Sequence, residues 1–284
     1  MKGLPIACTA VALAIQLTCT RATPSLDIAT TTSVVNSGLL DAMLPAFSDA
    51  RVDVHAAGSG RALAMLADRT VALVISHAPV AEREALARHP EWRYQKLATN
   101  RFILVGPEAD PAGVRRAANA TDAFARIAAA QVVFISRGDG SGTHERETAL
   151  WQLAGVVPPA GRLVIGGGSM AVTLQQANSQ LAYTLTDDAT WHQLRGQLES
   201  LAEVFGGDPG LLNSYAVIHR GDDSRAAALA AWLTIGGGRE AIAAYRIAGR
   251  PAFSVWPAGC FGAVPDAPFC GASGQRSRFN RDLE

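Results

Sequence analysis

Lysine is nearly absent from this sequence: Lys2 and Lys96 are the only lysines among 25 basic residues, and 25 acidic residues bring the net charge to zero. A balanced charge argues against nucleic-acid binding, because contacts to a phosphate backbone need a clustered excess of Lys and Arg. Long hydrophobic runs are missing after the first 22 residues, since no later segment approaches the ~20 apolar residues of a membrane span. We therefore expect a soluble mature protein that does not bind nucleic acid.

Motifs of nucleotide and zinc chemistry are also absent. No Gly-Lys-Ser/Thr follows a glycine-rich loop, neither Gly58 nor Gly140 begins a complete G-x-G-x-x-G, and H-E-x-x-H does not occur. His144 and Glu147 would share a helical face, but two such residues alone do not complete a metal site. We therefore expect no cofactor and no metal ion held by the protein's own ligands.

The first 22 residues have the pattern of a secretory signal peptide. Lys2 precedes an apolar stretch over residues 4–17, and a small-residue exit follows at residues 20–22. This pattern predicts an exported, periplasmic protein. Lipid anchoring at Cys19 is the alternative, although the residues before it make a poor lipobox.

Four cysteines are present in the sequence. Cys8 and Cys19 belong to the predicted leader, which leaves Cys260 and Cys270 as an even pair in an oxidising compartment. We expect these two to form one disulfide, which would stabilise the tail by roughly 3 kcal/mol in the chain-entropy model. Two free thiols or a metal site are the alternatives, although no His lies nearby to complete tetrahedral ligation.

From Leu26 onward, short β-prone runs alternate with longer helical segments. This alternation is typical of an α/β fold with a mostly parallel sheet. The Ala-rich stretches 81–88 and 117–130 carry few β-branched residues and are expected to be helical. The expected strands are 26–29, 52–54, 72–76, 101–106, 132–136, 162–166, 181–185 and 215–219.

Two breaks rich in glycine and proline divide the chain. Residues 106–111 (GPEADP) cannot continue a helix or a strand, and a second break precedes the expected strand at Tyr215. A chain that crosses twice between lobes builds a discontinuous first lobe. We expect this lobe to comprise residues 23–105 and 214–258, the second lobe residues 106–213, and a C-terminal tail residues 259–284.

Three expected strand-to-helix junctions are rich in hydroxyls and glycine: 30–33 (TTTS), 58–60 (GSG) and 136–143 (SRGDGSGT). The first turn of a helix has unpaired backbone N–H groups and a positive dipole end, which favour an anion. Ser and Thr are also ordinary N-cap residues, which is the simpler interpretation of each junction alone. The third junction contains more polar groups than a helix cap needs, because it also has an Arg that can bind an oxyanion with two parallel hydrogen bonds.

The run Arg137-Gly138-Asp139-Gly140-Ser141-Gly142-Thr143 resembles the anion-binding loop of periplasmic phosphate-binding proteins. The wider pattern is similar to the tungstate-binding proteins of ABC importers, over about residues 26–250. This resemblance implies the type II periplasmic binding fold: an α/β fold of two βαβ lobes with the ligand in the cleft between them. It also implies an importer permease as partner. The matching segments are 29–33, 37–40, 78–79, 102–107, 136–144 and 182–187.

His77 discriminates between candidate anions. In phosphate-binding proteins the residue before the matching Ala-Pro is an Asp that accepts the proton of hydrogen phosphate, whereas this chain has His77. Tungstate, molybdate and sulfate are fully ionised, and a carboxylate facing such a dianion would repel it. The expected ligand is therefore tungstate or molybdate rather than phosphate, and the preference for tungstate rests on the resemblance. A structural role near the cleft is the alternative for His77.

The junctions and the resemblance together predict an oxyanion site. Asp139 is expected to pair with Arg137 and hold it for the anion, while Arg61 is expected to point outward from its helix. Binding would occur by closure of the lobes of a monomer. The residues expected to contact the anion are Thr31, Thr32, Ser33, Ser59 and His77 from the first lobe and Arg137, Ser141, Gly142, Thr143 and Ser169 from the second.

An exported α/β-hydrolase is the alternative from a different class. Residues 167–171 (GGSMA) are a near match to a nucleophile elbow, with His192 and His219 downstream. The elbow requires Gly at its last position and an acid before the His. We therefore expect a binding protein rather than an enzyme.

Overall fold

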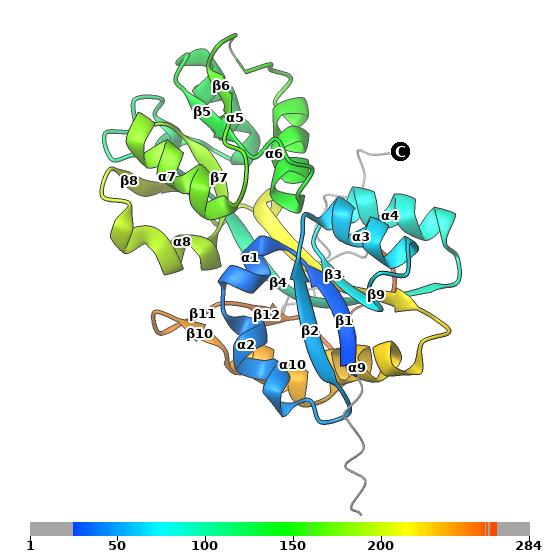
Figure 1. Ribbon diagram of the computed structural model, residues 1–284. Helices are drawn as coiled ribbons and strands as arrows, with labels where there is room; N and C mark the ends of the chain where they lie inside the picture. The colour runs from blue at the N-terminus through cyan, green and yellow to red at the C-terminus, as the bar shows by residue number, and fades with distance from the viewer. Residues whose placement is uncertain (1–24, 159, 259, 261, 266–284) are drawn as a thin grey trace, which may run out of the picture.

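The computed structural model describes residues 25–158, 160–258, 260 and 262–265. Two lobes lie side by side and are joined by extended strands (Figure 1). The predicted signal peptide, Cys19 and Cys270 lie outside the described residues. In the described part of the chain, no helix combines the length and the apolar character of a membrane span.

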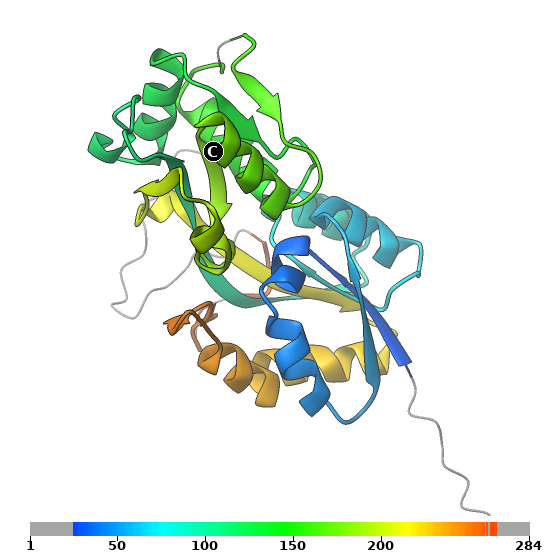
Figure 2. The ribbon, with the colours of Figure 1, turned by 60° about the vertical axis from the view of Figure 1, so that its left-hand side comes forward.

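The first lobe has a sheet at its centre, with strands in the order β12-β4-β9-β3-β1-β2. Helices cover both faces of this sheet (Figure 2). The strands are β1 (Ser25–Thr30), β2 (Arg51–Ala56), β3 (Leu73–Ser76), the first part of β4 (Trp92–Pro107), β9 (Leu212–Arg220) and β12 (Ser254–Val255), and a hairpin of β10 (Arg246–Ile247) and β11 (Arg250–Pro251) lies nearby. The helices are α1 (Thr32–Asn36), α2 (Leu39–Met43), η1 (Leu44–Ala46), α3 (Ser59–Ala67), α4 (Pro79–Arg88), α9 (Ser224–Ile235) and α10 (Gly237–Ala244).

Neighbouring residues of these strands point to opposite faces and build two apolar cores. Ile28 and Leu73 pack on the face covered by α2, α9 and α10. Ala29 and Val74 pack on the other face, against α3 and α4. A strand that is buried on both faces has to be apolar throughout, which is why β3 could be recognised from its sequence.

The second lobe follows β4 and has its own two cores. Its strands are the end of β4, β5 (Phe134–Ser136), β6 (Leu163–Ile165), β7 (Thr184–Asp187) and β8 (Leu201–Phe205). Its helices are η2 (Val114–Arg116), α5 (Ala120–Ala129), α6 (Gly142–Leu153), α7 (Met170–Gln180), α8 (Asp188–Leu194), η3 (Arg195–Gln197) and η4 (Pro209–Leu211).

Strand β4 runs through both lobes. It pairs with β9 as far as Arg101 and with β7 and β8 from Phe102 onward. The break expected at residues 106–111 therefore begins later, because Gly106 and Pro107 still belong to β4. The strand expected from Arg101 is the second half of a strand that begins at Trp92.

The expectation of a mostly parallel sheet is wrong. The pairs β1–β2, β1–β3 and β5–β6 are parallel, whereas β9 runs antiparallel to β3 and β4, and β4 runs antiparallel to β7 and β8. The reason lies in the two crossings: the chain leaves the first lobe along β4 and returns along β9, and these neighbours must run in opposite directions. The α/β class and the two lobes are as expected.

Near the C-terminus, Cys260 is disulfide-bonded. Because Cys270 lies outside the described residues, its pairing with Cys260 stays a prediction.

Candidate functional site

The hydroxyl groups of the first lobe gather at the carboxyl ends of parallel strands. Thr31 and Ser33, at the start of α1, are buried, and their hydroxyl oxygens lie 3.1 Å apart. Thr32 between them is half-buried. Ser59 opens α3, and its Oγ accepts the backbone N–H of His77 at 3.5 Å, which links the ends of two loops.

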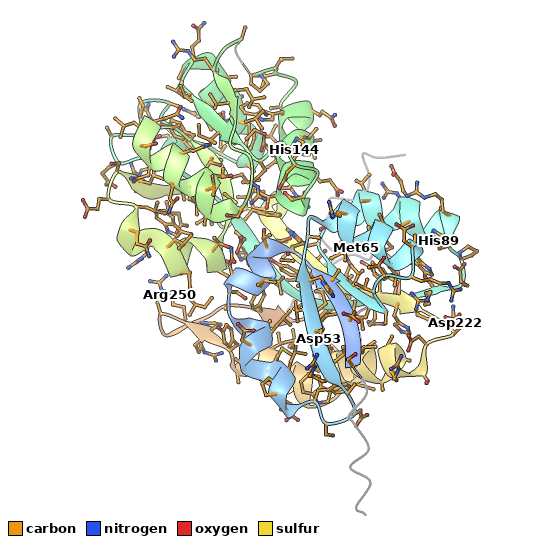
Figure 3. All side chains as sticks on the ribbon, in the orientation of Figure 1. Asp53, Met65, His89, His144, Asp222 and Arg250 are labelled. Atoms are coloured by element: carbon orange, nitrogen blue, oxygen red, sulfur yellow. The ribbon has the colours of Figure 1, made fainter. Side chains whose placement is uncertain are left out.

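The glycine-rich loop of the second lobe leads from β5 into α6. Ser141 is the N-cap of α6 and accepts the backbone N–H of His144 at 3.4 Å. Gly142 and Thr143 occupy the first turn and are buried. In Figure 3 His144 marks this first turn, near the junction of the two lobes. The loop therefore presents a helix N-terminus to the first lobe.

Arg137 is the buried cation of this loop, with 4% of its surface exposed. Its Nη2 donates to the carboxylate of Asp139 and to the carbonyl of Gly168 at 3.1 Å. Burial opposes ionisation of Asp139, but hydrogen bonds from Ser141 and Arg137 outweigh it and hold the pKa of this carboxyl below its ordinary value. The expected pairing of Asp139 with Arg137 is confirmed.

Ser169 is connected to the loop only indirectly. Its hydroxyl caps α7 by accepting the N–H of Val172 at 3.4 Å, while the preceding Gly168 contacts Arg137. The simpler interpretation, an ordinary N-cap, describes the observed bond of Ser169. The side chain of Arg61 is exposed on α3, as expected.

His77 belongs to a buried polar network that sequence reasoning missed. Its Nδ1 lies 3.0 Å from Oδ1 of Asn213, whose amide donates to Oδ1 of Asn100 at 2.7 Å and to the Tyr215 hydroxyl at 2.9 Å. The ring stacks on Tyr215 at 5.0 Å. Because the amide nitrogen of Asn213 is occupied, its oxygen faces the imidazole, and Nδ1 of His77 is the protonated nitrogen. Burial lowers the pKa of His77, which keeps the ring neutral.

The two lobes touch around this network. A Cβ atom added to Gly142 would lie 2.2 Å from the carbonyl oxygen of His77, and one added to Gly58 would lie 3.7 Å from that of Asp139. Only a glycine fits at position 142 when the lobes are this close. The structure is therefore a closed form, in which the α6 loop meets the ends of β3 and α3.

Three buried polar atoms near these contacts have no hydrogen-bond partner among the described residues. They are Nε of Arg137, Oγ1 of Thr30 and Oγ of Ser76. Thr30 and Ser76 end the neighbouring parallel strands β1 and β3. Leaving a buried donor unpaired costs about 1–3 kcal/mol, so such atoms are rare unless they serve a ligand or water.

A cavity of about 470 Å³ opens between the lobes beside His77 and Gly142. It is lined from the first lobe by Pro79 and Asn213 and from the second by Glu145 and Arg146. Larger hollows of about 630 and 830 Å³ lie elsewhere on the first lobe, and one of about 480 Å³ lies on the second lobe. None of the three is lined by a residue expected to contact the anion. Of the ten residues expected to contact the anion, His77 and Gly142 line the 470 Å³ cavity, and Arg137 does not. This cavity therefore lies at the edge of the lobe contact, beside the loop that carries Arg137.

The residues considered for a metal site or a hydrolase make other contacts. Among the described residues, no group of three His, Cys, Asp or Glu side chains could hold a metal ion. Nδ1 of His144 accepts the N–H of Gly140 at 3.0 Å, and Glu147 accepts the N–H of Arg137 at 3.2 Å. Ser169, the serine of the near-match elbow, is engaged as a helix cap.

Known proteins resemble this chain in sequence and in structure. Residues 20–235 match a PBP superfamily domain. The tungstate-binding protein TupA of Peptoclostridium acidaminophilum is 37% identical over 204 residues, which cover 70% of this chain and 71% of that protein. The tungstate-binding protein TupA of Desulfovibrio alaskensis G20 has a TM-score of 0.70 at 31% identity and covers 82% of this chain and 98% of its own. The structure of the tungstate ABC transporter from Geobacter sulfurreducens has a TM-score of 0.71 at 34% identity, with coverage of 78% and 98%.

Proposed function

The chain belongs to the PBP superfamily and, within it, to the tungstate-binding proteins of ABC transporters, and from this premise we propose that it captures tungstate for import. Its fold is the type II periplasmic binding fold. Binding proteins of this kind hold a ligand between two lobes that close on it. The α/β-hydrolase is not proposed further.

The unpartnered donors in the closed cleft are the observation that carries this proposal. Arg137 offers Nε from a buried guanidinium, and Gly142 and Thr143 begin α6, where backbone N–H groups have no partner within the helix. Thr31, Ser33 and Ser59 bring hydroxyls from the first lobe, and Thr30 and Ser76 add two that sequence reasoning did not select. A tetrahedral dianion needs such donors to replace its water.

The identity of the residue at position 77 supports a fully ionised anion over phosphate. His77 and its partner Asn213 place no carboxylate at this point of the site. A neutral imidazole does not repel a dianion as a carboxylate would, and tungstate and molybdate carry no proton for a carboxylate to accept. The choice of tungstate over molybdate follows the relatives, since the two anions share charge and shape.

The proposed mechanism is capture by closure. The anion docks on one lobe, the other lobe moves in, and donors of both replace the hydration shell. Thr31, Thr32, Ser33 and Ser59 act as donors from a first lobe of residues 23–105 and 214–258, where His77 contributes a neutral ring in place of a carboxylate. Arg137, Ser141, Gly142, Thr143 and Ser169 act from a second lobe of residues 106–213. The closed protein is then recognised by the importer permease.

The setting of this function is part of the proposal. Residues 1–22 act as a signal peptide, and the mature protein works in the periplasm as a monomer. A disulfide between Cys260 and Cys270 holds the tail at 259–284. The bonded state of Cys260 and the match to periplasmic binding proteins support these points.

Isothermal titration calorimetry tests the proposal with four anions. Tungstate and molybdate are expected to release or absorb heat at one site per chain, whereas phosphate is expected to bind about a hundredfold more weakly or not at all. Sulfate, which is also fully ionised, shows how far the site separates dianions of the same charge. A His77→Asp variant should bind tungstate more weakly, because its carboxylate repels the dianion. Tight phosphate binding by the wild-type protein would overturn the assignment of the ligand.

A further inference from the structure

The side chain of Glu145 in the second lobe contacts the first lobe at the edge of the cleft. Glu145 lies in the first turns of α6, and its two oxygens accept backbone N–H groups of α4 in the first lobe. Oε1 lies 2.9 Å from the nitrogen of Val80, and Oε2 lies 3.3 Å from that of Ala81. Figure 1 shows α6 approaching α4 at this boundary.

The start of α4 lacks a complete cap of its own. The N-cap residue is Ala78, which has no side-chain oxygen, and Pro79 has no N–H to satisfy. Glu82 of the same helix accepts the N–H of Ala78 at 3.0 Å. The next two N–H groups, of Val80 and Ala81, are bonded to the other lobe, so the best-capped state of α4 is the closed state.

The same helix also carries the anion loop. Glu145 follows Ser141, Gly142 and Thr143 directly, so a movement that brings the N-terminus of α6 to the anion brings Glu145 to α4. His77, which precedes the N-cap residue of α4, lies against Gly142 in the same closed arrangement. Anion contacts and the α4 contact therefore form and break together.

We propose that Glu145 is a positioning residue that latches the closed cleft by capping α4 of the opposite lobe, and thereby slows release of the bound oxyanion without touching it. This inference rests on the proposed function, because it concerns the closure of that same site. The negative charge of Glu145 faces a helix N-terminus, where it is favourable. Burial raises the pKa of this carboxyl, so closure carries a desolvation cost that keeps the latch reversible.

Release kinetics in the full chain test the latch. Glu145→Ala removes both acceptors, whereas Glu145→Gln keeps one oxygen that can accept an N–H. The control is Glu84→Ala, an exposed carboxylate further along α4. Stopped-flow tryptophan fluorescence measures the association and release rate constants of tungstate, and thermal unfolding is recorded with and without it.

Glu145→Ala is expected to release tungstate about tenfold faster, with association changed less than twofold, since two hydrogen bonds to a charged group are lost. Glu145→Gln should show a smaller increase, and Glu84→Ala none. The rise in melting temperature on adding tungstate should be smaller in Glu145→Ala than in the wild type, whereas loss of a residue that only stabilised the fold would lower the melting temperature equally with and without tungstate. Release at the wild-type rate, or an equal loss of stability without tungstate, would overturn the latch.

Failure of the proposed function would give a different result. Wild-type protein would then show no tungstate signal at all, and the latch would be judged from the radius of gyration of ligand-free protein in solution. Glu145→Ala is then expected to be more extended than the wild type and Glu84→Ala to match it. An unchanged radius for Glu145→Ala would reject the latch in that case.

Discussion

Arg137 meets several requirements of the proposed anion site. Its guanidinium is almost fully buried, yet Asp139 and the Gly168 carbonyl engage only one of its terminal nitrogens in hydrogen bonds. Nε has no partner among the described residues. Asp139 thus orients the charge, and part of the planar donor set stays available to a ligand.

Replacement of Arg137 should be the most damaging single change to anion binding. Arg137→Ala removes the buried charge and leaves the Asp139 carboxylate without its cation, so both changes oppose a dianion. We expect a loss of about 3 kcal/mol, or more than a hundredfold in Kd. Arg137→Lys should recover part of this loss, since it keeps the charge without the planar fork.

Calorimetry with tungstate provides the measurement for Arg137. Arg61→Ala is the matched control, because Arg61 is exposed on α3 and should bind tungstate within twofold of wild type. Wild-type affinity in Arg137→Ala would show that the site has been placed wrongly.

At the scale of elements, α6 carries three functions in consecutive turns. Its N-terminus faces the cleft, and Glu145 contacts α4. Glu147 holds the loop between β5 and α6 by accepting the backbone N–H of Arg137. Glu147 is 3% exposed, and burial raises its pKa to about 7. Asp188, at the start of α8, also has a pKa raised to about 7, by burial and by the charge of Asp187.

Because the pKa values of these two carboxyls are raised, we expect the free energy of unfolding to fall as pH rises. The ordinary pKa is 4.5 for Glu147 and 3.8 for Asp188. Between this value and the raised pKa, the folded protein binds more protons than the unfolded chain, so the free energy of unfolding decreases as pH rises. For Glu147 the full effect is about 3 kcal/mol from pH 4.5 to pH 7. Glu147→Gln, which keeps an oxygen for the N–H of Arg137, should therefore lose less stability over this range.

Urea unfolding at pH 5, 6, 7 and 8 measures this dependence. Glu84→Gln serves as the control, because this exposed carboxyl should leave the pH dependence of the wild type unchanged. If Glu147→Gln is as sensitive to pH as the wild type, Glu147 is not the responsible group.

At the scale of the molecule, two strands join the lobes and carry the network behind the site. Asn100 on β4 and Asn213 on β9 face each other in register at the crossing and share a hydrogen bond of 2.7 Å. Asn100 also donates to Asp187 of the second lobe at 3.4 Å, while Asn213 contacts His77 of the first. The crossing strands thus connect both lobes to the site.

Gly142 tests whether binding requires the closed form. Gly142→Ala keeps the backbone N–H that would face the anion, but its Cβ would meet the His77 carbonyl at 2.2 Å. A backbone carbonyl cannot move aside easily, so the lobes must stay apart, and tungstate affinity should fall about tenfold or more. Gly60→Ala is the control, because a Cβ there has no neighbour within 4 Å.

Small-angle scattering with and without tungstate follows the closure directly. The wild type and Gly60→Ala should become more compact on binding, and Gly142→Ala should contract less. Full contraction of Gly142→Ala with unchanged affinity would mean that the closed contact is not needed for capture.

Local pattern was sufficient for most individual elements and for the anion loop. β3 is apolar because both of its faces are buried, and α5 lies within the Ala-rich stretch expected to be helical. The loop at Arg137 could be found because its residues are neighbours in the chain and because a helix start has the same chemistry in any fold. Thr31 and Ser59 were selected for the same reason, and their contact with the anion stays a prediction.

Only the tertiary structure decided the direction of the sheet and the partners of these residues. The apolar pattern of the strands predicts that Asn100, Asn213 and Tyr215 are interior residues. It does not predict that they lie next to His77. From the sequence, Glu145 is likewise an ordinary acidic residue in the first turn of a helix. Only the tertiary structure shows that its carboxylate accepts N–H groups of α4. Such contacts join residues far apart in the chain, and their energies depend on geometry that local propensity does not contain. The sequence by itself therefore determined which chemistry the protein carries, while the folding of two lobes around two crossing strands decided where that chemistry comes together.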